Sequence, residues 1–327
     1  MTRAPEKAGV YLARINRSDG LIAVIHGKLM ARGLANYFDM TYVDMNIESI
    51  SHEPADLSQE AYGKAGERFF GLGEKQLKFE SVRGSAHVHY VKHLEDLSHE
   101  PGTLNVLGTE KRNWKRKLLR RPGRMRPLAT PDLELQLAGI APDLKTPADV
   151  FVPIQEQLRK VYDCGPSRRV KTDYESDRLD VAIHIRRGDI VADQLWRRFT
   201  PNAYYSSVIR QLKTLLEDQP FRVHIFSETK PKPSLLDEDF SPFEDLGCCM
   251  HLDEDVFETV HHLVTADVLV TSRSSFSYVP GVLSRGVVLY EPFWHSPMSS
   301  WIVCDGEGRF DGERFRILLQ DAAWPNR

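Results

Sequence analysis

Short apolar runs alternate with helix-length segments from residue 179 to residue 290, and this alternation limits the fold more than any other feature of the sequence. The apolar runs lie at residues 179–185, 221–227, 248–252, 267–271 and 287–290. The helix-length segments lie at residues 200–218, 255–265 and 272–286, and the first begins with Thr200 as N-cap and Pro201 as first helical residue. Strands and helices at such short intervals form a parallel sheet covered by helices, so we predict a Rossmann-like domain.

The first apolar run ends in a group of charged residues. Val181, Ile183 and Ile185 recur at every second position, which predicts a strand with one packed face. Residues 186–189, Arg-Arg-Gly-Asp, follow immediately. Ligands of open α/β sheets lie outside the carboxyl ends of the strands, and two guanidinium groups beside a glycine suit a pyrophosphate. The alternative is an edge strand that ends in a solvated turn or in an adhesion-type Arg-Gly-Asp tripeptide.

Two later strand ends carry hydroxyl groups that we expect in the same crevice. Ser227 ends the second apolar run, and Ser272, Ser274 and Ser275 follow the fourth run at the start of a helix. Free backbone N–H groups and the dipole at a helix start attract phosphate. For Ser274 and Ser275 the alternative is plain helix capping. Their combination with the two arginines favours a phosphate site.

The amino-terminal half predicts a second α/β unit. Residues 9–15 are expected to form a strand, residues 21–38 a helix and residues 40–45 the next strand, which is the pattern of a βαβ unit. The tripeptide His-Gly-Lys that begins at His26 resembles part of a phosphate loop, but Ile22 stands where that loop requires glycine, so we reject a P-loop. Proline-rich residues 122–147 have the composition of a linker or an inter-domain excursion.

Two further segments have alternative interpretations. His87, His89 and His93 are close in sequence, but no single secondary structure directs all three to one ion, so we predict no metal site. Residues 111–126 contain no acidic residue. They form either a weak contact surface for an anionic membrane, a nucleic acid or an acidic acceptor, or a solvated helix and loop.

The composition predicts a soluble cytoplasmic protein. The chain of 327 residues carries 43 Lys and Arg against 46 Asp and Glu, a net charge of -3, which argues against a dedicated nucleic-acid binder. No apolar run reaches the roughly 18 residues of a membrane span, and the first residues lack the layout of a secretory signal. The four cysteines have no metal-finger spacing, so we expect free thiols in a reducing compartment.

Three segments resemble the α1,2- and α1,6-fucosyltransferases, which are related to the protein O-fucosyltransferases. Residues 184–189, His-Ile-Arg-Arg-Gly-Asp, resemble the His-x-Arg-Arg-x-Asp signature of that family. Residues 265–277 resemble its later strand and Ser-Ser-Phe-Ser loop, and residues 20–26 are similar to a Gly-x-Gly-x-x-x-His helix start. The chain departs from the family at Ile22, which replaces the second glycine, and at Arg273, where relatives often carry an uncharged residue.

The resemblance implies a GT-B fold of two Rossmann-like domains with mostly parallel sheets, in which the second domain binds most of the donor. We place an acceptor-side domain at residues 1–150 and a nucleotide-sugar-binding domain at residues 151–327. The resemblance further implies an inverting, metal-independent transfer of L-fucose from GDP-fucose to a hydroxyl of a glycan or other acceptor, without a cofactor. The expected partners are a GDP-sugar donor and a glycan acceptor, and the protein is a monomer or a homodimer.

The resemblance also implies roles for individual residues. Arg186 and Arg187 hold the pyrophosphate and neutralise the leaving GDP, with Arg187 as a catalytic residue. His184 contacts the nucleotide, and Glu258 lies near the position where relatives bind guanine with an acid. The further donor-binding residues are Ser227, Ser274, Ser275 and Phe276, the acceptor-side residues are His26 and Lys28, and the candidate bases are Asp189 and Asp193.

Several alternatives stay open at this stage. Glu258 is also explained as an exposed helix glutamate, and Asp189 as a residue that only orients the arginines. The donor is either GDP-fucose or another nucleotide sugar, such as a pentose donor. A protein that binds a sugar nucleotide or a glycan without catalysis is a third alternative, because no residue is clearly fixed as the base.

Overall fold

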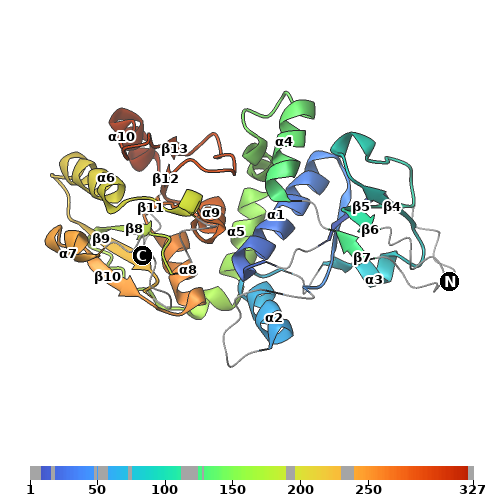
Figure 1. Ribbon diagram of the computed structural model, residues 1–327, viewed down its shortest axis with the longest axis horizontal. Helices are drawn as coiled ribbons and strands as arrows, with labels where there is room; N and C mark the ends of the chain where they lie inside the picture. The colour runs from blue at the N-terminus through green and yellow to red at the C-terminus, as the bar shows by residue number, and fades with distance from the viewer. Residues whose placement is uncertain are drawn as a thin grey trace. The chain divides into compact units, whose positions relative to one another are not determined.

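The chain forms two compact units that divide between Pro166 and Ser167, as a computed structural model shows (Figure 1). We call them unit 1 and unit 2. The residues that the structure describes are 9–15, 19–47, 50, 58–72, 76–111, 124–126, 129–188, 196–229 and 239–322. Each unit contains a parallel sheet with helices packed on it, which confirms the predicted α/β fold class of two Rossmann-like domains.

The sheet of unit 1 has the strand order β3-β2-β1-β5-β4, and all its pairs are parallel. Its strands are β1 (Tyr11–Arg14), β2 (Thr41–Asp44), β3 (Leu77–Lys78), β4 (His87–Val91) and β5 (Thr103–Leu107). The helices of unit 1 are α1 (Leu21–Tyr37), α2 (Gln59–Phe69), α3 (Phe79–Val82), α4 (Thr130–Ile140) and α5 (Gln155–Asp163). The predicted βαβ unit is therefore present as β1, α1 and β2.

Three shorter helices and a hairpin complete unit 1 and its border. The 3₁₀ helices are η1 (Leu94–Asp96), η3 (Pro147–Ile154) and η4 (Pro166–Arg169), and the antiparallel strands are β6 (Thr109–Lys111) and β7 (Arg124–Arg126). The predicted linker contains α4, because buried Leu133 and Leu137 anchor that helix in unit 1. The boundary lies beyond the predicted residue 150, because Tyr162 of α5 packs on Phe69 with ring centroids 5.7 Å apart.

The sheet of unit 2 has the strand order β10-β9-β8-β11-β12-β13, again with parallel pairs throughout. Its strands are β8 (Leu179–His184), β9 (Phe221–Ser227), β10 (Cys249–Leu252), β11 (Val268–Val270), β12 (Val287–Tyr290) and β13 (Ile302–Val303). Its helices are η5 (Trp196–Arg198), α6 (Asn202–Leu215), α7 (Ser241–Asp245), α8 (Val256–Thr265), α9 (Ser275–Leu283) and α10 (Gly312–Asp321). The predicted alternation of strands and helices is confirmed.

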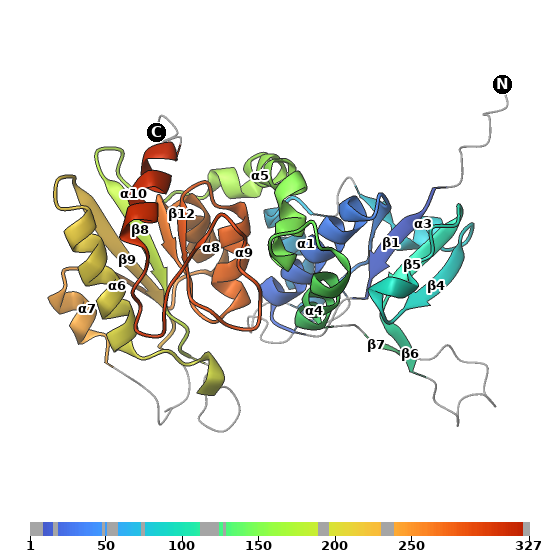
Figure 2. The same ribbon diagram turned by 90° about the horizontal axis from the view of Figure 1, so that it is seen from above.

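The two faces of β8 have different chemistry because side chains alternate along a strand. Val181 and Ile183 belong to the apolar core that includes Tyr205 of α6 and Phe315 of α10. His184 points to the opposite face, which α8 and α9 cover (Figure 2). Every residue of β8 is buried, as expected for a central strand of a parallel sheet.

The order of the strands defines where a ligand fits in unit 2. The chain moves outward from β8 to β9 and β10, and then returns to β11 on the other side of β8. The carboxyl ends of β8 and β11 therefore border a topological switch point, where open α/β sheets bind their ligands. We refer to this place as the β8–β11 switch point.

One helix start differs from its prediction. Helix α6 begins at Asn202, and Pro201 takes the N-cap position that the sequence assigned to Thr200. The reason is that the hydroxyl of Thr200 donates a hydrogen bond to the Glu291 carboxylate. In the described part of the chain, no helix combines the length and apolar character needed to cross a membrane.

Candidate functional site

His184 joins the two strand ends at the switch point. It is the last residue of β8, and its Nδ1 lies 2.7 Å from the Oγ of Ser272, which follows β11. Its ring stacks on Phe276 of α9, with centroids 4.9 Å apart and planes inclined by 30°. These contacts bring His184 of the first motif together with Ser272 and Phe276 of the second. The sequence predicted this meeting from the order of the strands alone.

The pKa of His184 is lowered to about 3 by burial and, further, by the positive charges of Arg186 and Arg187. The imidazole is therefore neutral at physiological pH. A field that disfavours one more cation favours an anion at the same place. The charges of Arg186 and Arg187, the smaller cause of the shift, are the part that favours an anion at the end of β8.

The guanidinium group of Arg187 is fixed inside the unit. It is 5% exposed, donates to the carbonyl oxygen of Thr200 (3.0 Å) and to Oδ1 of Asn202 (2.6 Å), and lies 4.6 Å from the ring centroid of Phe199. Arg186, by contrast, is partly exposed. Gly188 then takes a φ of 68°, a left-handed conformation that explains the glycine after the two arginines.

The start of α9 lies at the same switch point. Ser274 is the N-cap, and its Oγ accepts a hydrogen bond from the Phe276 N–H at 3.2 Å. Ser275 is partly exposed in the first turn. The Ser274 hydroxyl thus caps the helix, while the positive end of the helix dipole still favours a phosphate.

Two residues predicted to bind the nucleotide-sugar donor, Ser227 and Glu258, have positions that indicate no single role. The hydroxyl of Ser227 donates to the carbonyl oxygen of Ile185 at 2.8 Å, so it ties the ends of β8 and β9 together. Glu258 is exposed in the first turn of α8, and its N–H donates to the capping residue Asp255. Both an exposed helix glutamate and a ligand-binding residue are compatible with that position of Glu258.

Glu291 is a buried carboxylate that the sequence motifs did not single out. It follows β12, is 1% exposed and binds Thr200 and Tyr205, the latter through a 3.1 Å hydrogen bond. Its Oε1 also forms an ion pair with Nε of Arg273 at 2.9 Å. Burial raises the pKa of Glu291, although Thr200, Arg273 and Tyr205 act in the opposite direction. The strand-end rule, applied to the run at 287–290, could have found this residue.

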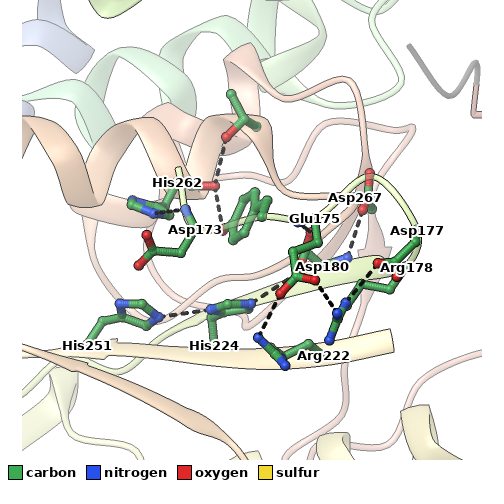
Figure 3. A network of polar contacts seen from close by, with 12 residues as sticks. Asp173, Glu175, Asp177, Arg178, Asp180, Arg222, His224, His251, His262 and Asp267 are labelled. Atoms are coloured by element: carbon green, nitrogen blue, oxygen red, sulfur yellow. Dashed lines mark hydrogen bonds and ion pairs between the residues drawn. The ribbon is translucent and has the colours of Figure 1, made fainter. Parts of the chain in front are cut away.

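A chain of buried histidines lies on the face of the sheet that α8 covers (Figure 3). Nε2 of His224 lies 3.2 Å from Oδ1 of Asp180, and its Nδ1 lies 2.9 Å from Nε2 of His251. Nδ1 of His251 lies 2.8 Å from Oε1 of Glu254. The chain thus links β8, β9 and β10 to the loop before α8.

The number of imidazole protons limits how the hydrogen-bonded histidines can be paired. Each of the three contacts of His224 and His251 needs one N–H proton, but two neutral imidazoles carry only two. The network therefore needs one proton more than two neutral imidazoles carry. We assign this network to the packing of unit 2, because its contacts run across β8, β9 and β10 and involve none of the residues predicted to bind the sugar donor.

The predicted acceptor-side residues lie inside unit 1. Lys28 is 2% exposed, and its ammonium group lies 2.6 Å from Asp44 and 2.8 Å from Glu67, in a buried cluster of opposite charges. His26 is 1% exposed, with its ring 6.3 Å from that of Phe151. These positions give no support to a surface contact by Lys28, and its role toward an acceptor stays a prediction.

The glycine between these residues has a packing explanation. A Cβ added to Gly27 would lie 1.7 Å from Nη1 of Arg14, the last residue of β1. The guanidinium group of Arg14 also donates to Oγ1 of Thr130 at 3.0 Å. Gly27 therefore makes room for an arginine, in agreement with the rejection of a P-loop.

Several predictions concern residues outside the described ranges. Asp189 and Asp193, the candidate bases, lie there, as does most of the basic segment 111–126. Of the three clustered histidines, His87 and His89 are in β4, and Nε2 of His89 contacts the carbonyl oxygen of Asp96 at 2.9 Å. The structure thus assigns a local partner to one of them.

Comparisons with known proteins return low identities. No protein-family model and no curated protein match the chain. A crystal structure of NodZ alpha-1,6-fucosyltransferase soaked with GDP-fucose is 10% identical with a TM-score of 0.37, covering 85% of this chain and 93% of that chain. The structure of E. coli heptosyltransferase WaaC with ADP-2-deoxy-2-fluoro heptose is 11% identical with a TM-score of 0.36, covering 96% of this chain and 99% of that chain.

A crystal structure of fucosyltransferase NodZ from Bradyrhizobium is also similar. It is 10% identical with a TM-score of 0.36, and the match covers 85% of this chain and 94% of that chain. The solved structures that the chain resembles thus include glycosyltransferases of two kinds. Similarity at this level defines no substrate, so the function is argued from the site.

Proposed function

We propose that this protein is an inverting glycosyltransferase that transfers L-fucose from GDP-fucose to a hydroxyl of a glycan. One observation carries the proposal: the contact of His184 with Ser272 brings the arginine pair and the start of α9 together at the β8–β11 switch point. A diphosphate needs several fixed cationic and N–H donors in one place. This convergence supplies both kinds of donor from two separate strand ends.

Arg186 acts on the leaving group in this proposal, and Arg187 supports Arg186. When the bond between the sugar and the β-phosphate breaks, GDP gains negative charge. The partly exposed Arg186 and the first turn of α9 neutralise that charge, and buried Arg187 stabilises the turn from which Arg186 projects. The reaction as proposed uses no metal, because protein cations perform the neutralisation.

The nucleobase and the acceptor have separate binding groups in this proposal. The exposed carboxylate of Glu258 accepts the two adjacent N–H donors of guanine, and neutral His184 contacts the nucleotide. Asp189 or Asp193 deprotonates the acceptor hydroxyl, which then attacks the sugar from the face opposite to GDP.

Nucleotide binding tests the donor assignment. Thermal unfolding of the purified protein with GDP, UDP or ADP should show stabilisation by GDP in preference to the others. Stabilisation by UDP alone would instead select a transferase with another donor. A protein that none of the three nucleotides stabilises would contradict the proposed function.

Catalysis is tested by a separate measurement. Incubation with GDP-fucose and a panel of glycans should release GDP in proportion to fucosylated product. Arg187→Ala and Arg186→Ala should both abolish turnover. A protein that binds GDP but neither transfers nor hydrolyses GDP-fucose would be a sugar-nucleotide-binding protein rather than an enzyme.

A further inference from the structure

We infer that Arg273 is a further guanidinium group for the donor diphosphate, beside Arg186, and that Glu291 is the residue that positions it. This inference rests on the proposed function, because it deepens the account of the same site. It concerns a residue that departs from the pattern of the family that the sequence resembles. The argument starts from where Arg273 lies in the chain.

The backbone of Arg273 is fixed at the switch point on both sides. The preceding residue, Ser272, contacts the His184 ring through its Oγ, and its backbone N–H donates a hydrogen bond to Ser277 Oγ at 3.0 Å. The following residue, Ser274, is the N-cap of α9. Arg273 therefore occupies the middle of the loop that borders the proposed diphosphate position.

The side chain of Arg273 is held by two partners and keeps a third nitrogen for a ligand. Nε forms the 2.9 Å ion pair with Oε1 of Glu291, and Nη1 donates to the carbonyl oxygen of Arg197 at 3.2 Å. Nη2 has no partner among the residues that the structure describes, and the side chain is 35% exposed. A guanidinium group held in this way is oriented before a ligand arrives, which favours diphosphate binding.

Glu291 is itself held in place by its surroundings. The hydroxyl of Tyr205 donates to Oε2 at 3.1 Å, Thr200 donates to Oε1, and the Glu291 N–H donates to Oγ1 of Thr271 at 3.0 Å. The carboxylate is thus oriented by Tyr205 of α6 and by Thr200 just before α6, and the Glu291 backbone is held by Thr271 after β11. A carboxylate with this many fixed donors can hold Arg273 in one orientation.

The same carboxylate connects to Arg187 through Thr200. Thr200 donates its hydroxyl to Glu291 and accepts the hydrogen bond from Arg187 at its carbonyl oxygen. Besides Arg273, the titratable groups Tyr204, Tyr205 and Cys304 interact electrostatically with Glu291. Burial raises the pKa of each of these three groups, so they are neutral and leave Arg273 as the charged partner of Glu291.

The alternative is that the Glu291–Arg273 pair only stabilises the loop before α9. Removal of a loop-stabilising pair would weaken the binding of every nucleotide equally. Removal of a diphosphate-binding arginine would weaken the binding of those ligands that carry a diphosphate. A positioning carboxylate also acts through Arg273, so its removal has no further effect once Arg273 is gone. These two differences define the experiment.

The experiment is isothermal titration calorimetry with GDP, GMP and inorganic pyrophosphate. We expect Arg273→Ala to weaken GDP and pyrophosphate binding about tenfold or more and to change GMP binding much less. Glu291→Gln should weaken the same two ligands about threefold or more, because the carboxamide cannot pair with the guanidinium group. The double variant should bind no more weakly than Arg273→Ala. Arg285→Ala, which removes the same charge beyond the other end of α9, should bind like the wild type.

The outcomes separate the inference from the proposed function. If Arg186→Ala loses pyrophosphate binding while Arg273→Ala binds like the wild type, the inference fails and the proposed function stands. Equal losses for GMP and GDP in Arg273→Ala would assign the residue a structural role and also overturn the inference. A wild-type protein that binds neither GDP, UDP nor ADP would remove the proposed function first. If Glu291→Gln does not fold, the Arg273→Ala result still decides, because that side chain is partly exposed.

Discussion

Both units bury a basic side chain near the carboxyl end of a parallel sheet, but the surroundings of Lys28 in unit 1 and Arg187 in unit 2 differ. Lys28 lies between the carboxylates of Asp44 and Glu67, and Lys78 contacts Asp44 from the other side. Arg187 donates to the carbonyl oxygen of Thr200 and to the amide of Asn202. The first cation is held by charge, and the second is oriented by polar groups.

The pKa values of Asp44 in unit 1 and His184 in unit 2 show the consequence of these different surroundings. Burial opposes ionisation of Asp44, but the charges and hydrogen bonds of Lys28 and Lys78 outweigh it and lower the pKa of this carboxyl. In unit 2 burial and the arginine charges together lower the pKa of His184. Opposite charges in unit 1 therefore compensate each other, whereas the field of the unit 2 arginines reaches the adjacent side chain. The cation of unit 1 is thus neutralised inside the fold, whereas in the proposed function Arg186 of unit 2 faces an anionic ligand.

Removal of Lys28 should have the largest effect on stability. Lys28→Met leaves Asp44 and Glu67 buried without their cation, which costs about 3–5 kcal/mol in comparable buried pairs. Urea unfolding measures the loss. The control Lys64→Met, in an exposed pair with Glu60, should leave the free energy of unfolding nearly unchanged. Equal stability of the two variants would break the comparison between the units.

Removal of Arg186 and removal of Arg187 should differ in their effects on pyrophosphate binding and on stability. Arg186→Ala should weaken pyrophosphate binding by about 1.5–3 kcal/mol, the usual contribution of a hydrogen bond to a charged group, with little change in stability. Arg187→Ala should also destabilise the fold by about 1–3 kcal/mol, because buried acceptors at Thr200 and Asn202 lose their donor. Calorimetry and urea unfolding give the two quantities. Two variants with identical stability would contradict the different burial of the arginines.

The pH dependence of stability should report on His184. Its pKa is near 6.5 in the unfolded chain and about 3 in the folded protein, so the unfolded chain binds the proton first as pH falls. The wild type should therefore lose about 2 kcal/mol from this residue between pH 6.5 and pH 5. In His184→Asn this contribution should be absent, and the difference between the two unfolding profiles isolates it from other histidines. Parallel profiles would show that burial and the arginines do not act on this ring.

Two helix caps provide the smallest and most selective comparison. Ser274→Ala and Asp311→Ala each remove the cap of one unit 2 helix and should each destabilise the fold by about 1 kcal/mol. Pyrophosphate binding should weaken in Ser274→Ala, at the start of α9, and stay unchanged in Asp311→Ala, at the start of α10. Equal binding by both variants would mean that the start of α9 does not contact the diphosphate.

The sequence predicted most of the fold because local patterns determine it. Alternating apolar residues defined β8, and the spacing of runs predicted the parallel sheet and the place where strand ends meet. The same reasoning missed α4, because the prolines of the segment gave it the composition of a linker, although buried Leu133 and Leu137 have the four-residue spacing of a helix. Pairing with distant elements, rather than local composition, anchors that helix.

The side-chain partners of the site could not be predicted in the same way. Glu291 binds Thr200 and Arg273, which are 91 and 18 positions away along the chain, and only the folded sheet brings the three together. Lys28 was assigned to the acceptor because its motif resembles a ligand-binding helix start, yet Asp44 and Glu67 come from other elements. The His224–His251 contact likewise depends on the register of β9 and β10.

The most direct test of the central claim is a crystal structure of the protein with GDP bound. The account predicts that the diphosphate lies at the β8–β11 switch point, within hydrogen-bonding distance of the Arg186 guanidinium group and of N–H groups in the first turn of α9. A diphosphate bound away from both of these groups would contradict the claim that unit 2 uses its arginines to bind a nucleotide-sugar donor.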